Sequence, residues 1–308
     1  MHENEIEKIV HKEGGFTWIS ISSPNEDSIK YLKQNYDFHP LDLEDCLSGI
    51  QRPKIDDYED YLFLVLRTPI HKKKQIRGDE VDIFISQKYI ITVHHSNPII
   101  KKVFANLEKD KVQRKEYMEK GTGYFLHMII DDIFESGFPL LEDISKQISD
   151  LEHDVFDTVR SRDRLREILL LKKDIINFRR IIMPQRAIIA QLEHKNKKFL
   201  PENLDVYFDD IVDKIEKMWN QLENLQELVV SLHETNESII SHNTNNVIKV
   251  LTLFSVIMLP LTFITGFYGM NIANLPYSEG NESALIVSGF MILVVFVMLG
   301  IFKYKKWL

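Results

Sequence analysis

The side chains best suited to chemistry form a polar stripe along one predicted helix face, with a residue at every third or fourth position. Its first part carries charged, amide and hydroxyl groups and comprises Asp210, Asp213, Lys217, Asn220, Asn224, Glu227, Ser231, Glu234, Ser238, Ser241 and Asn245. With no break in phase, the stripe enters an apolar segment as Ile248, Thr252, Ser255, Leu259, Thr262 and Gly266. Such residues suit contact with water, ions or another helix, rather than covalent catalysis.

The simplest explanation of the pattern differs between the two parts of this stripe. For residues 210–245, the solvated face of an amphipathic helix explains the pattern better than a binding surface does. In the apolar segment, lipid would give no reason for Thr252, Ser255 and Gly266, whereas a water-filled lumen or a close helix contact would. The spacing leaves the lumen and the helix contact open as alternatives.

Two apolar segments must position the second part of the stripe. The whole chain, with 308 residues, 27% of them charged and a formal net charge of −8, has the composition of a soluble protein. Residues 250–302 differ, because their only formal charges are Glu279 and Glu282. At about 1.5 Å per residue, segments 250–268 and 284–302 would each span roughly 30 Å as helices. We predict two transmembrane helices; a buried hairpin of a soluble protein is the alternative.

Charge beside these segments predicts their orientation. Lys249 precedes the first segment, the loop 269–283 has no lysine or arginine, and the second segment is followed by Lys303, Lys305 and Lys306. Positive charge accumulates on the cytoplasmic side, so we expect both ends of the chain to be cytoplasmic. The acidic N-terminus lacks the apolar core of a signal peptide, which agrees with this topology in the cell membrane.

The remaining chain divides where the period of its apolar residues changes. Short runs rich in β-branched and aromatic residues predict strands at 16–21, 61–70 and 81–95, the last a hairpin turning near Gln87. Helices are expected at 25–36 and 40–47, and from 121 onward the period is helical, with breaks near Ser161 and at 194–203. The predicted parts are an α/β domain (1–120), a long-helix stalk (121–249), a pore-lining transmembrane helix (250–268), an external loop (269–283), a second transmembrane helix (284–302) and a basic cytoplasmic tail (303–308).

The stalk also carries an apolar seam with alternating spacings of three and four. Its members are Phe208, Ile211, Ile215, Met218, Leu222, Leu225, Val229 and Leu232. Such a heptad seam packs on neighbouring helices and offers a surface for assembly. Because no helix breaker occurs between Leu204 and Pro260, stalk and first span are expected to form one helix. Two spans cannot enclose a pore, but several copies of the chain could.

Other possible sites have weaker support. His94 and His95 end a predicted strand, but no third ligand lies at a metal-binding spacing, and surface or core histidines are commoner. The chain has no glycine-rich phosphate loop and no nucleophile motif, so we expect neither an enzyme nor an organic cofactor. We expect no nucleic-acid partner. The single cysteine, Cys46, excludes an intrachain disulfide and fits a reducing compartment.

Several segments together resemble the CorA family of magnesium transporters. The tripeptide Gly269-Met270-Asn271 follows the first span, and the chain ends in the lysine-rich "KKWL". Residues 39–67 ("HPLDLEDCLSGIQRPKIDDYEDYLFLVLR"), 138–144 ("FPLLEDI") and 247–271 ("VIKVLTLFSVIMLPLTFITGFYGMN") match family segments in order and spacing. The resemblance covers essentially the whole chain.

The resemblance implies a homopentamer with a cytoplasmic funnel, embedded in the lipid bilayer and conducting divalent cations inward under the membrane potential. Magnesium is the expected ion, with cobalt or nickel as further cargo. The pore would be lined by the first span, with Asn271 contacting the hydrated ion at the outer entrance. The pore and selectivity residues carried over are Asn245, Leu251, Leu259, Thr262, Gly266, Gly269, Met270 and Asn271.

Magnesium chemistry agrees with such an entrance. Magnesium dehydrates reluctantly, so a ring of amide oxygens from Asn271 can accept hydrogen bonds from its bound waters without stripping them. The loop acids Glu279 and Glu282 can raise the local cation concentration. Gly269 is expected to permit a backbone turn that a larger residue would strain. Leu251 and Leu259 are candidate apolar constrictions, although leucines in a membrane helix usually only pack.

Regulation and ion identity depend on weaker matches. The family closes when cytoplasmic magnesium binds between subunits, and Asp210 matches one acid of that site, with Asp213 nearby. No partner acid carries over, because residues 71–80 ("HKKKQIRGDE") are basic, although Asp79 or Glu80 could substitute. A zinc transporter of the same superfamily usually lacks the methionine of Gly-Met-Asn, so Met270 favours magnesium. A two-span sensor or anchor protein is the alternative from another class.

Overall fold

The computed structural model describes residues 6–11, 15–49, 51–72, 75–154, 161–193, 199–200, 204–270 and 283–307. By its internal contacts the chain divides between Thr235 and Asn236 into two compact units. The first unit contains an α/β domain and helices packed on it, whereas the second contains two apolar helical segments. The predicted fold class, an α/β N-terminal domain followed by long helices and two C-terminal apolar helices, is confirmed.

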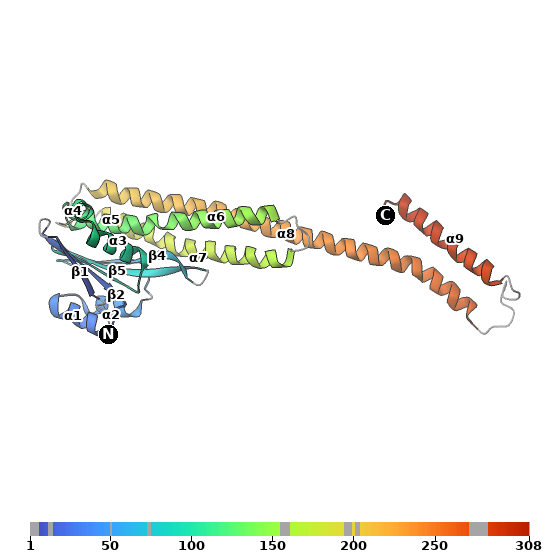
Figure 1. Ribbon diagram of the computed structural model, residues 1–308, viewed down its shortest axis with the longest axis horizontal. Helices are drawn as coiled ribbons and strands as arrows, with labels where there is room; N and C mark the ends of the chain where they lie inside the picture. The colour runs from blue at the N-terminus through green and yellow to red at the C-terminus, as the bar shows by residue number, and fades with distance from the viewer. Residues whose placement is uncertain are drawn as a thin grey trace. The chain divides into compact units, whose positions relative to one another are not determined.

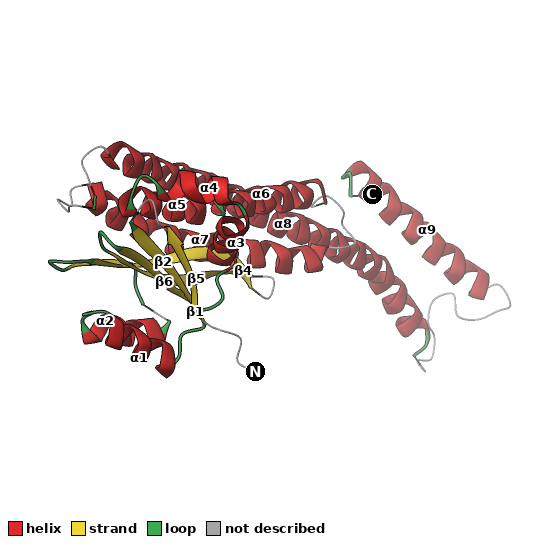
Figure 2. Cartoon of the chain, turned by 60° about the vertical axis from the view of Figure 1, so that its left-hand side comes forward, coloured by secondary structure: helices red, strands yellow, loops and turns green. Residues whose placement is uncertain are grey.

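One mixed sheet forms the centre of the first unit (Figures 1 and 2). In the described residues its strand order is β1-β2-β6-β5-β4-β3. Neighbouring strands are antiparallel except β2 and β6, which are parallel. The strands are β1 (Ile6–His11), β2 (Phe16–Ser22), β3 (Lys54–Asp57), β4 (Leu62–Lys72), β5 (Gln75–Ile85) and β6 (Tyr89–His94).

Both faces of the sheet are covered, which makes three layers. Helices α1 (Glu26–Asn35) and α2 (Pro40–Ser48) cover one face, where Ile19, Phe63 and Phe84 belong to an apolar core. Successive side chains of a strand point to opposite faces, so Trp18 faces the other side. There its ring contacts Phe104 on α3 (Pro98–Lys109) and Phe125 on α5 (Thr122–Glu135). Helix α7 (Ser161–Glu193) packs on β4 and β5.

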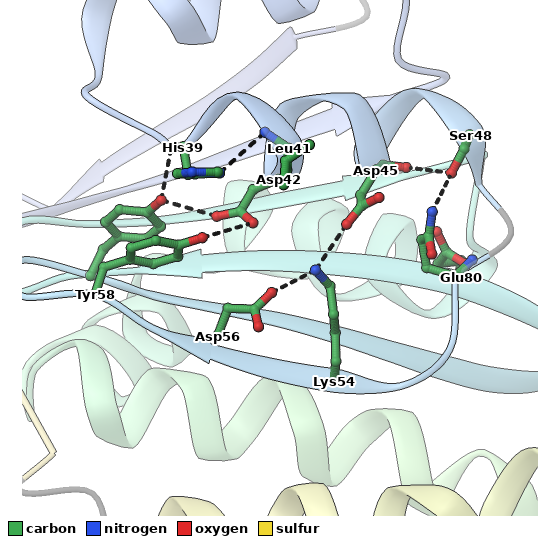
Figure 3. A network of polar contacts seen from close by, with 11 residues as sticks. His39, Leu41, Asp42, Asp45, Ser48, Lys54, Asp56, Tyr58 and Glu80 are labelled. Carbon is green, nitrogen blue, oxygen red and sulfur yellow. Dashed lines mark hydrogen bonds and ion pairs between the residues drawn. The ribbon is translucent and has the colours of Figure 1, made fainter.

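The short helix α2 is fixed at both ends by its own sequence. Pro40 occupies its first turn and His39 caps it, with the His39 ring Nδ1 accepting from the Leu41 N–H at 3.3 Å. Gly49 ends the helix in the left-handed conformation, at φ +60°, which glycine adopts without steric cost. Figure 3 shows Lys54 of β3 between Asp45 and Asp56, an ion pair that ties α2 to the sheet.

The same helix carries a buried carboxylate. Asp42 is 1% exposed and accepts hydrogen bonds from the hydroxyls of Tyr58 and Tyr61 at 3.2 and 3.0 Å (Figure 3). The Tyr61 hydroxyl also accepts from the His39 N–H. Burial raises the pKa of Asp42 above its ordinary value, and the two tyrosine hydrogen bonds oppose that shift.

The structure corrects several element predictions. Strands β1 and β3 were not predicted, and β5 begins at Gln75 rather than at residue 81. Helices α3 and α4 (Lys111–Met118) also lie in a region that the sequence left unassigned. The reason is that β1 and β3 lie at the sheet edges and carry polar residues. Their strand structure depends on pairing with a neighbouring strand, which an apolar alternation in the sequence does not reveal. The predicted helices at 25–36 and 40–47 and the hairpin near Gln87 are confirmed.

A single helix connects the two units. Helix α8 (Asp205–Tyr268) has 64 residues and includes Pro260, as the absence of earlier helix breakers predicted. Its apolar seam is buried from Phe208 to Leu232, with exposed fractions of 0–8%. Within this chain, Phe208 contacts His127 of α5, and the space beside Gly137 at the start of α6 (Gly137–Asp154) is filled by Met218. The seam is therefore covered by helices of its own chain, and the expectation that it serves assembly is wrong.

Two segments of the described chain are long and apolar enough to cross a membrane. One is the C-terminal part of α8 and the other is α9 (Ser283–Tyr304). Their most apolar windows have mean hydropathies of 2.3 and 2.9 and are 0% and 6% buried. A core hairpin of a soluble protein would be mostly buried, so this alternative finds no support.

Candidate functional site

The predicted pore face lies on the exposed second part of α8. At about 100° per residue, Leu259, Thr262 and Gly266 lie within roughly 60° of one another around the helix. Asn245 and Leu251 fall on either side of them, within an arc of roughly 120°. Leu251 is 64% and Leu259 74% exposed, and a Cβ atom at Gly266 would contact nothing within 4 Å. One chain therefore leaves this face open along its length.

Hydroxyl groups on this face present their oxygens as acceptors. Ser255 donates its hydroxyl hydrogen to the Leu251 carbonyl at 2.9 Å, and Thr262 donates to the Met258 carbonyl at 2.9 Å. Since each hydroxyl has a single hydrogen, its remaining lone pairs can only accept. An acceptor surface of this kind suits a cation that arrives with its bound water.

The last hydrogen bonds at the end of helix α8 come from Gly269 and Met270. The Gly269 N–H donates to the Thr265 carbonyl at 2.9 Å, and the Met270 N–H donates to the Phe267 carbonyl at 3.4 Å. A larger residue was expected to strain the backbone at Gly269, and this strain does not come from a positive φ. The reason for glycine is a close approach, since a Cβ atom would lie 3.0 Å from the Thr265 oxygen.

The predicted outer entrance itself lies outside the described residues. This holds for Asn271, the proposed ligand of the hydrated ion, and for the loop acids Glu279 and Glu282. Their assignments remain predictions. Gly269 and Met270, the first two members of the tripeptide, nevertheless lie directly after the last turn of helix α8.

The acidic positions near the start of α8 lie on an exposed face. Asp210 and Asp213 are both exposed, but Lys214 lies 3.7 Å from the Asp210 carboxylate. Lys214 also pairs with Asp131 at 2.5 Å and Glu135 at 3.4 Å, both on α5. Burial alone would lower the pKa of Lys214, but these carboxylates raise it above its ordinary value. A cation arriving at Asp210 therefore competes with an ammonium group already there.

The sequence did not predict this role of Lys214. Its position four residues after Asp210 was a readable signal for a helical ion pair. Asp131 and Glu135 lie on another helix, and nothing in the local sequence marks them as partners. In the described parts of the chain, no three His, Cys, Asp or Glu side chains gather closely enough to hold a metal ion.

The acids suggested as partners for Asp210 are not available at the surface. Asp79 is 8% and Glu80 4% exposed, and both belong to β5. Asp79 accepts from the Asn97 side chain at 2.8 Å, and Glu80 accepts from the Gln51 N–H. Burial raises the pKa of both carboxyl groups. Their interior position disfavours a role as ligands between subunits.

His94 is a core residue rather than a metal ligand. It is 1% exposed, and its Nδ1 accepts from the Asn97 N–H at 3.0 Å. The remaining nitrogen, Nε2, lies 3.1 Å from the Ser20 hydroxyl, so the proton of the neutral ring belongs on Nε2. Burial, then the nearby Lys101 and His95, lower its pKa to about 4. Both ring nitrogens are thus occupied by hydrogen bonds.

The two exposed apolar helices, together with the α/β unit that precedes them, indicate an integral membrane protein. The model of the family described as "CorA-like Mg2+ transporter protein" matches residues 13–306. The chain belongs to this family, whose members are ion transporters rather than enzymes.

Individual relatives agree on the family but differ in their named ions. The cobalt/magnesium transport protein CorA of Thermotoga maritima is 29% identical over 296 residues, which cover 95% of this chain and 83% of that protein. The zinc transport protein ZntB of Yersinia enterocolitica is 24% identical over 299 residues, which cover 94% and 88%.

Among solved structures, the CorA magnesium transporter of Methanocaldococcus jannaschii has the same fold. It superposes with a TM-score of 0.84 at 20% identity, covering 97% of this chain and 94% of that chain. The α/β unit, the long helix and the two apolar helices thus recur together in a known membrane protein. The chain is accordingly a member of a family of divalent metal ion transporters.

Proposed function

We propose that this protein is the subunit of a channel through which magnesium enters the cell. The observation that carries the proposal is the open face of α8, where Ser255 and Thr262 turn acceptor oxygens outward in a membrane-length apolar segment that ends at Gly269 and Met270. A lipid-facing helix gains nothing from such oxygens, whereas a hydrated cation can hydrogen-bond to them.

The pore requires several copies of the chain, and we propose a homopentamer. The seam of α8 is buried within its own subunit, so the exposed stripe from Asp210 to Asn245 is the surface left on this helix for lining the axis. Leu251 and Leu259 then form apolar constrictions, with Thr262 and Gly266 beyond them and Asn271 at the entrance. Leu251 and Thr252 are both exposed, so the isolated chain fits either as the lumen-facing residue.

We further propose that both chain ends lie in the cytoplasm, with residues 269–283 outside the cell. The lysines at 303, 305 and 306 support this orientation through the positive-inside bias. The membrane potential then drives uptake, and it favours entry of a divalent cation by roughly 4.6 kcal/mol per 100 mV. A cysteine at Ser278, in a chain with Cys46 replaced, should react with an impermeant maleimide outside intact cells; labelling only after lysis would reverse the orientation.

Magnesium is proposed as the main ion because Met270 completes the Gly-Met-Asn tripeptide. Zinc is the second candidate, since a zinc transport protein is among the relatives. Cobalt and nickel are candidate additional cargo, because a cobalt/magnesium transport protein is also among them. Regulation by cytoplasmic magnesium at Asp210 and Asp213 would close the channel.

Ion flux into proteoliposomes tests the proposal. With an inside-negative potential, magnesium uptake should exceed that of protein-free vesicles, and excess zinc should compete weakly. Zinc uptake with no magnesium uptake would transfer the assignment to the zinc class. A protein that inserts and oligomerises but conducts neither ion would instead be a two-span sensor or anchor.

A further inference from the structure

The first unit contains a large cationic cavity that the proposed ion pathway does not use. Its volume is about 1120 Å³, and its walls come from the end of α2, strands β4 and β5, and α7. Two acidic residues, Asp79 and Glu80, line it, whereas its cationic lining residues are Arg52, Arg67, Lys72, Arg77, Lys173 and Arg180. Since the chain as a whole carries a formal net charge of −8, this concentration of positive charge is not a reflection of composition.

Arg67 is held in the cavity wall by a defined set of contacts. Its backbone N–H donates to the Gln185 side-chain oxygen at 2.9 Å, and the Gln185 amide donates back to the Arg67 carbonyl at 2.8 Å. Gln185 is fully buried on α7, so this pair clamps α7 to β4. The guanidinium lies over Gly78, where a Cβ atom would come within 3.0 Å of its Nε. Glycine at 78 therefore makes room for the arginine.

Two buried polar atoms of this wall have no hydrogen-bond partner among the residues that the structure describes. The Arg67 guanidinium donates from one terminal nitrogen to the Gly78 carbonyl at 3.2 Å, but its buried Nε–H has no hydrogen-bond acceptor among the described residues. In the same part of the structure, Oε1 of Glu80 is buried and has no hydrogen-bond donor among the described residues. Such groups are costly when left unpaired, which makes a donor-and-acceptor ligand a natural complement.

The outer cations form no close ion pair among the described residues, although Lys72 and Arg67 interact electrostatically with Asp79. Arg52, Lys72, Arg77, Lys173 and Arg180 are exposed, and none forms an ion pair with a described residue. Their shared property is an exposed positive charge around one cavity. Arginine guanidinium groups bind phosphate through paired N–H donors, and lysine ammonium groups add point charges.

The rest of the lining suits a ligand that is more than a bare phosphate. The half-buried Ile70 supplies an apolar part of the wall, and Ile76 and Ile181 are buried behind it. Glu80 lies deeper in the wall, and the volume is slightly above the usual range for compounds of drug-like size. A ligand with several phosphates and a flat apolar ring uses these features.

We propose that this cavity binds a nucleoside di- or triphosphate. The phosphates contact Arg67 and the outer cations, and the base packs on the half-buried Ile70. The proposal concerns a site in the first unit and does not depend on ion transport by the second. Binding there would make the protein respond to the nucleotide concentration as well as to the metal ion.

The test is ATP binding to the purified full-length protein in detergent, measured by calorimetry in the presence of EDTA so that metal sites stay empty. ATP should bind saturably, and the double variant Arg77→Gln with Arg180→Gln should weaken binding at least about tenfold, because charge-assisted hydrogen bonds to the phosphates are lost. The control removes two exposed lysines that do not line the cavity, Lys30→Gln with Lys33→Gln, and should leave affinity unchanged.

Further arms separate specific from general anion binding. Adenosine and inorganic phosphate should each bind far more weakly than ATP, because each satisfies only part of the lining. The proposal fails if ATP shows no saturable binding, or if sulfate at equal ionic strength displaces it as well as ADP does. It also fails if both double variants lose affinity equally, or if an acidic peptide binds while ATP does not. Melting temperatures of both variants without ligand show whether either has lost its fold.

Discussion

At the scale of single residues, the same side-chain type has different roles according to its surroundings. His94 is buried and hydrogen-bonded on both nitrogens, whereas the adjacent His95 is exposed. Asp210 is exposed and faces Lys214, whereas Glu80 of β5 is buried with one unpaired oxygen. Burial and neighbours, rather than residue type, decide which of these groups can meet an ion.

The first prediction concerns the entrance. Asn271→Ala should reduce magnesium uptake about tenfold or more, because the amide oxygens that hydrogen-bond to the waters of the ion would be lost at roughly 1.5–3 kcal/mol each. Uptake into proteoliposomes at equal protein content measures the effect. Asn274→Ala, in the same loop, is the matched control and should conduct normally. Equal uptake by both variants would remove Asn271 from the entrance.

The second prediction concerns pH. The pKa of His94 is lowered from 6.5 to about 4, so the unfolded chain binds a proton that the folded chain does not in this range. The resulting stability, on the order of 3 kcal/mol, is fully present above pH 6.5 and is lost as the pH falls to about 4.

The melting temperature of the detergent-solubilised protein, measured from pH 7 to pH 4, checks this effect. His94→Gln should be less stable at pH 7 but should lose less stability over that range than the parent does. His95→Gln is the matched control because it changes an exposed neighbour. Buried carboxyl groups titrate in all three proteins and cancel in the comparison. Parallel curves for parent and His94→Gln would contradict the assignment.

At the scale of elements, α8 has two different environments along its 64 residues. Its seam from Phe208 to Leu232 is buried by helices of the same chain, whereas the continuation through Leu251 and Leu259 is exposed. The hydrophobic effect therefore fixes the first part in a single subunit. The second part is exposed in the described chain, so packing within the subunit does not fix it.

The third prediction tests this division with one kind of substitution. Leu222→Ala, at a fully buried seam position, should lower the free energy of unfolding by about 2–5 kcal/mol, through lost burial and a cavity. Leu228→Ala, on the same helix at a position 48% exposed, should cost far less. Thermal unfolding of the two variants compares them directly, and equal losses would show that the seam is not the stabilising face.

At the scale of the whole molecule, a binding site for regulatory magnesium is expected where subunits meet. Asp210 and Asp213 lie on an exposed face, and copies around a symmetry axis would multiply their charge. Magnesium bridging these carboxylates favours whichever state brings them together. Because Lys214 already lies near Asp210, magnesium must compete with it, so inhibition should require a high cytoplasmic concentration.

The fourth prediction follows from that arrangement. Asp210→Ala should raise the internal magnesium concentration needed for half-inhibition several-fold, and adding Asp213→Ala should raise it further, since several sites together steepen the response. Uptake against internal magnesium gives the curve for each variant. Glu108→Ala, at an exposed position on α3, is the control and should not move it. Superimposable curves for wild type and Asp210→Ala would show that Asp210 has no regulatory role and belongs to a solvated helix face.

The sequence by itself determined the features that depend on local order. The apolar period marked the seam of α8, the absence of breakers predicted its continuity, and the two charge-poor segments predicted the apolar helices. These signals are readable because a helix repeats every 3.6 residues and a membrane requires a fixed apolar length. The edge strands β1 and β3 were not predicted, because their polar residues form a regular strand only by pairing with a neighbouring strand.

Only the tertiary structure decided which distant groups meet. It covered the seam with helices of the same chain, placed Lys214 between Asp210 and Asp131, and buried Glu80 beneath a cationic wall. It also gathered the cationic cavity from arginines and lysines between positions 52 and 180. Such contacts join residues far apart in sequence, and no local period encodes them, because burial and charge depend on which surfaces fold together.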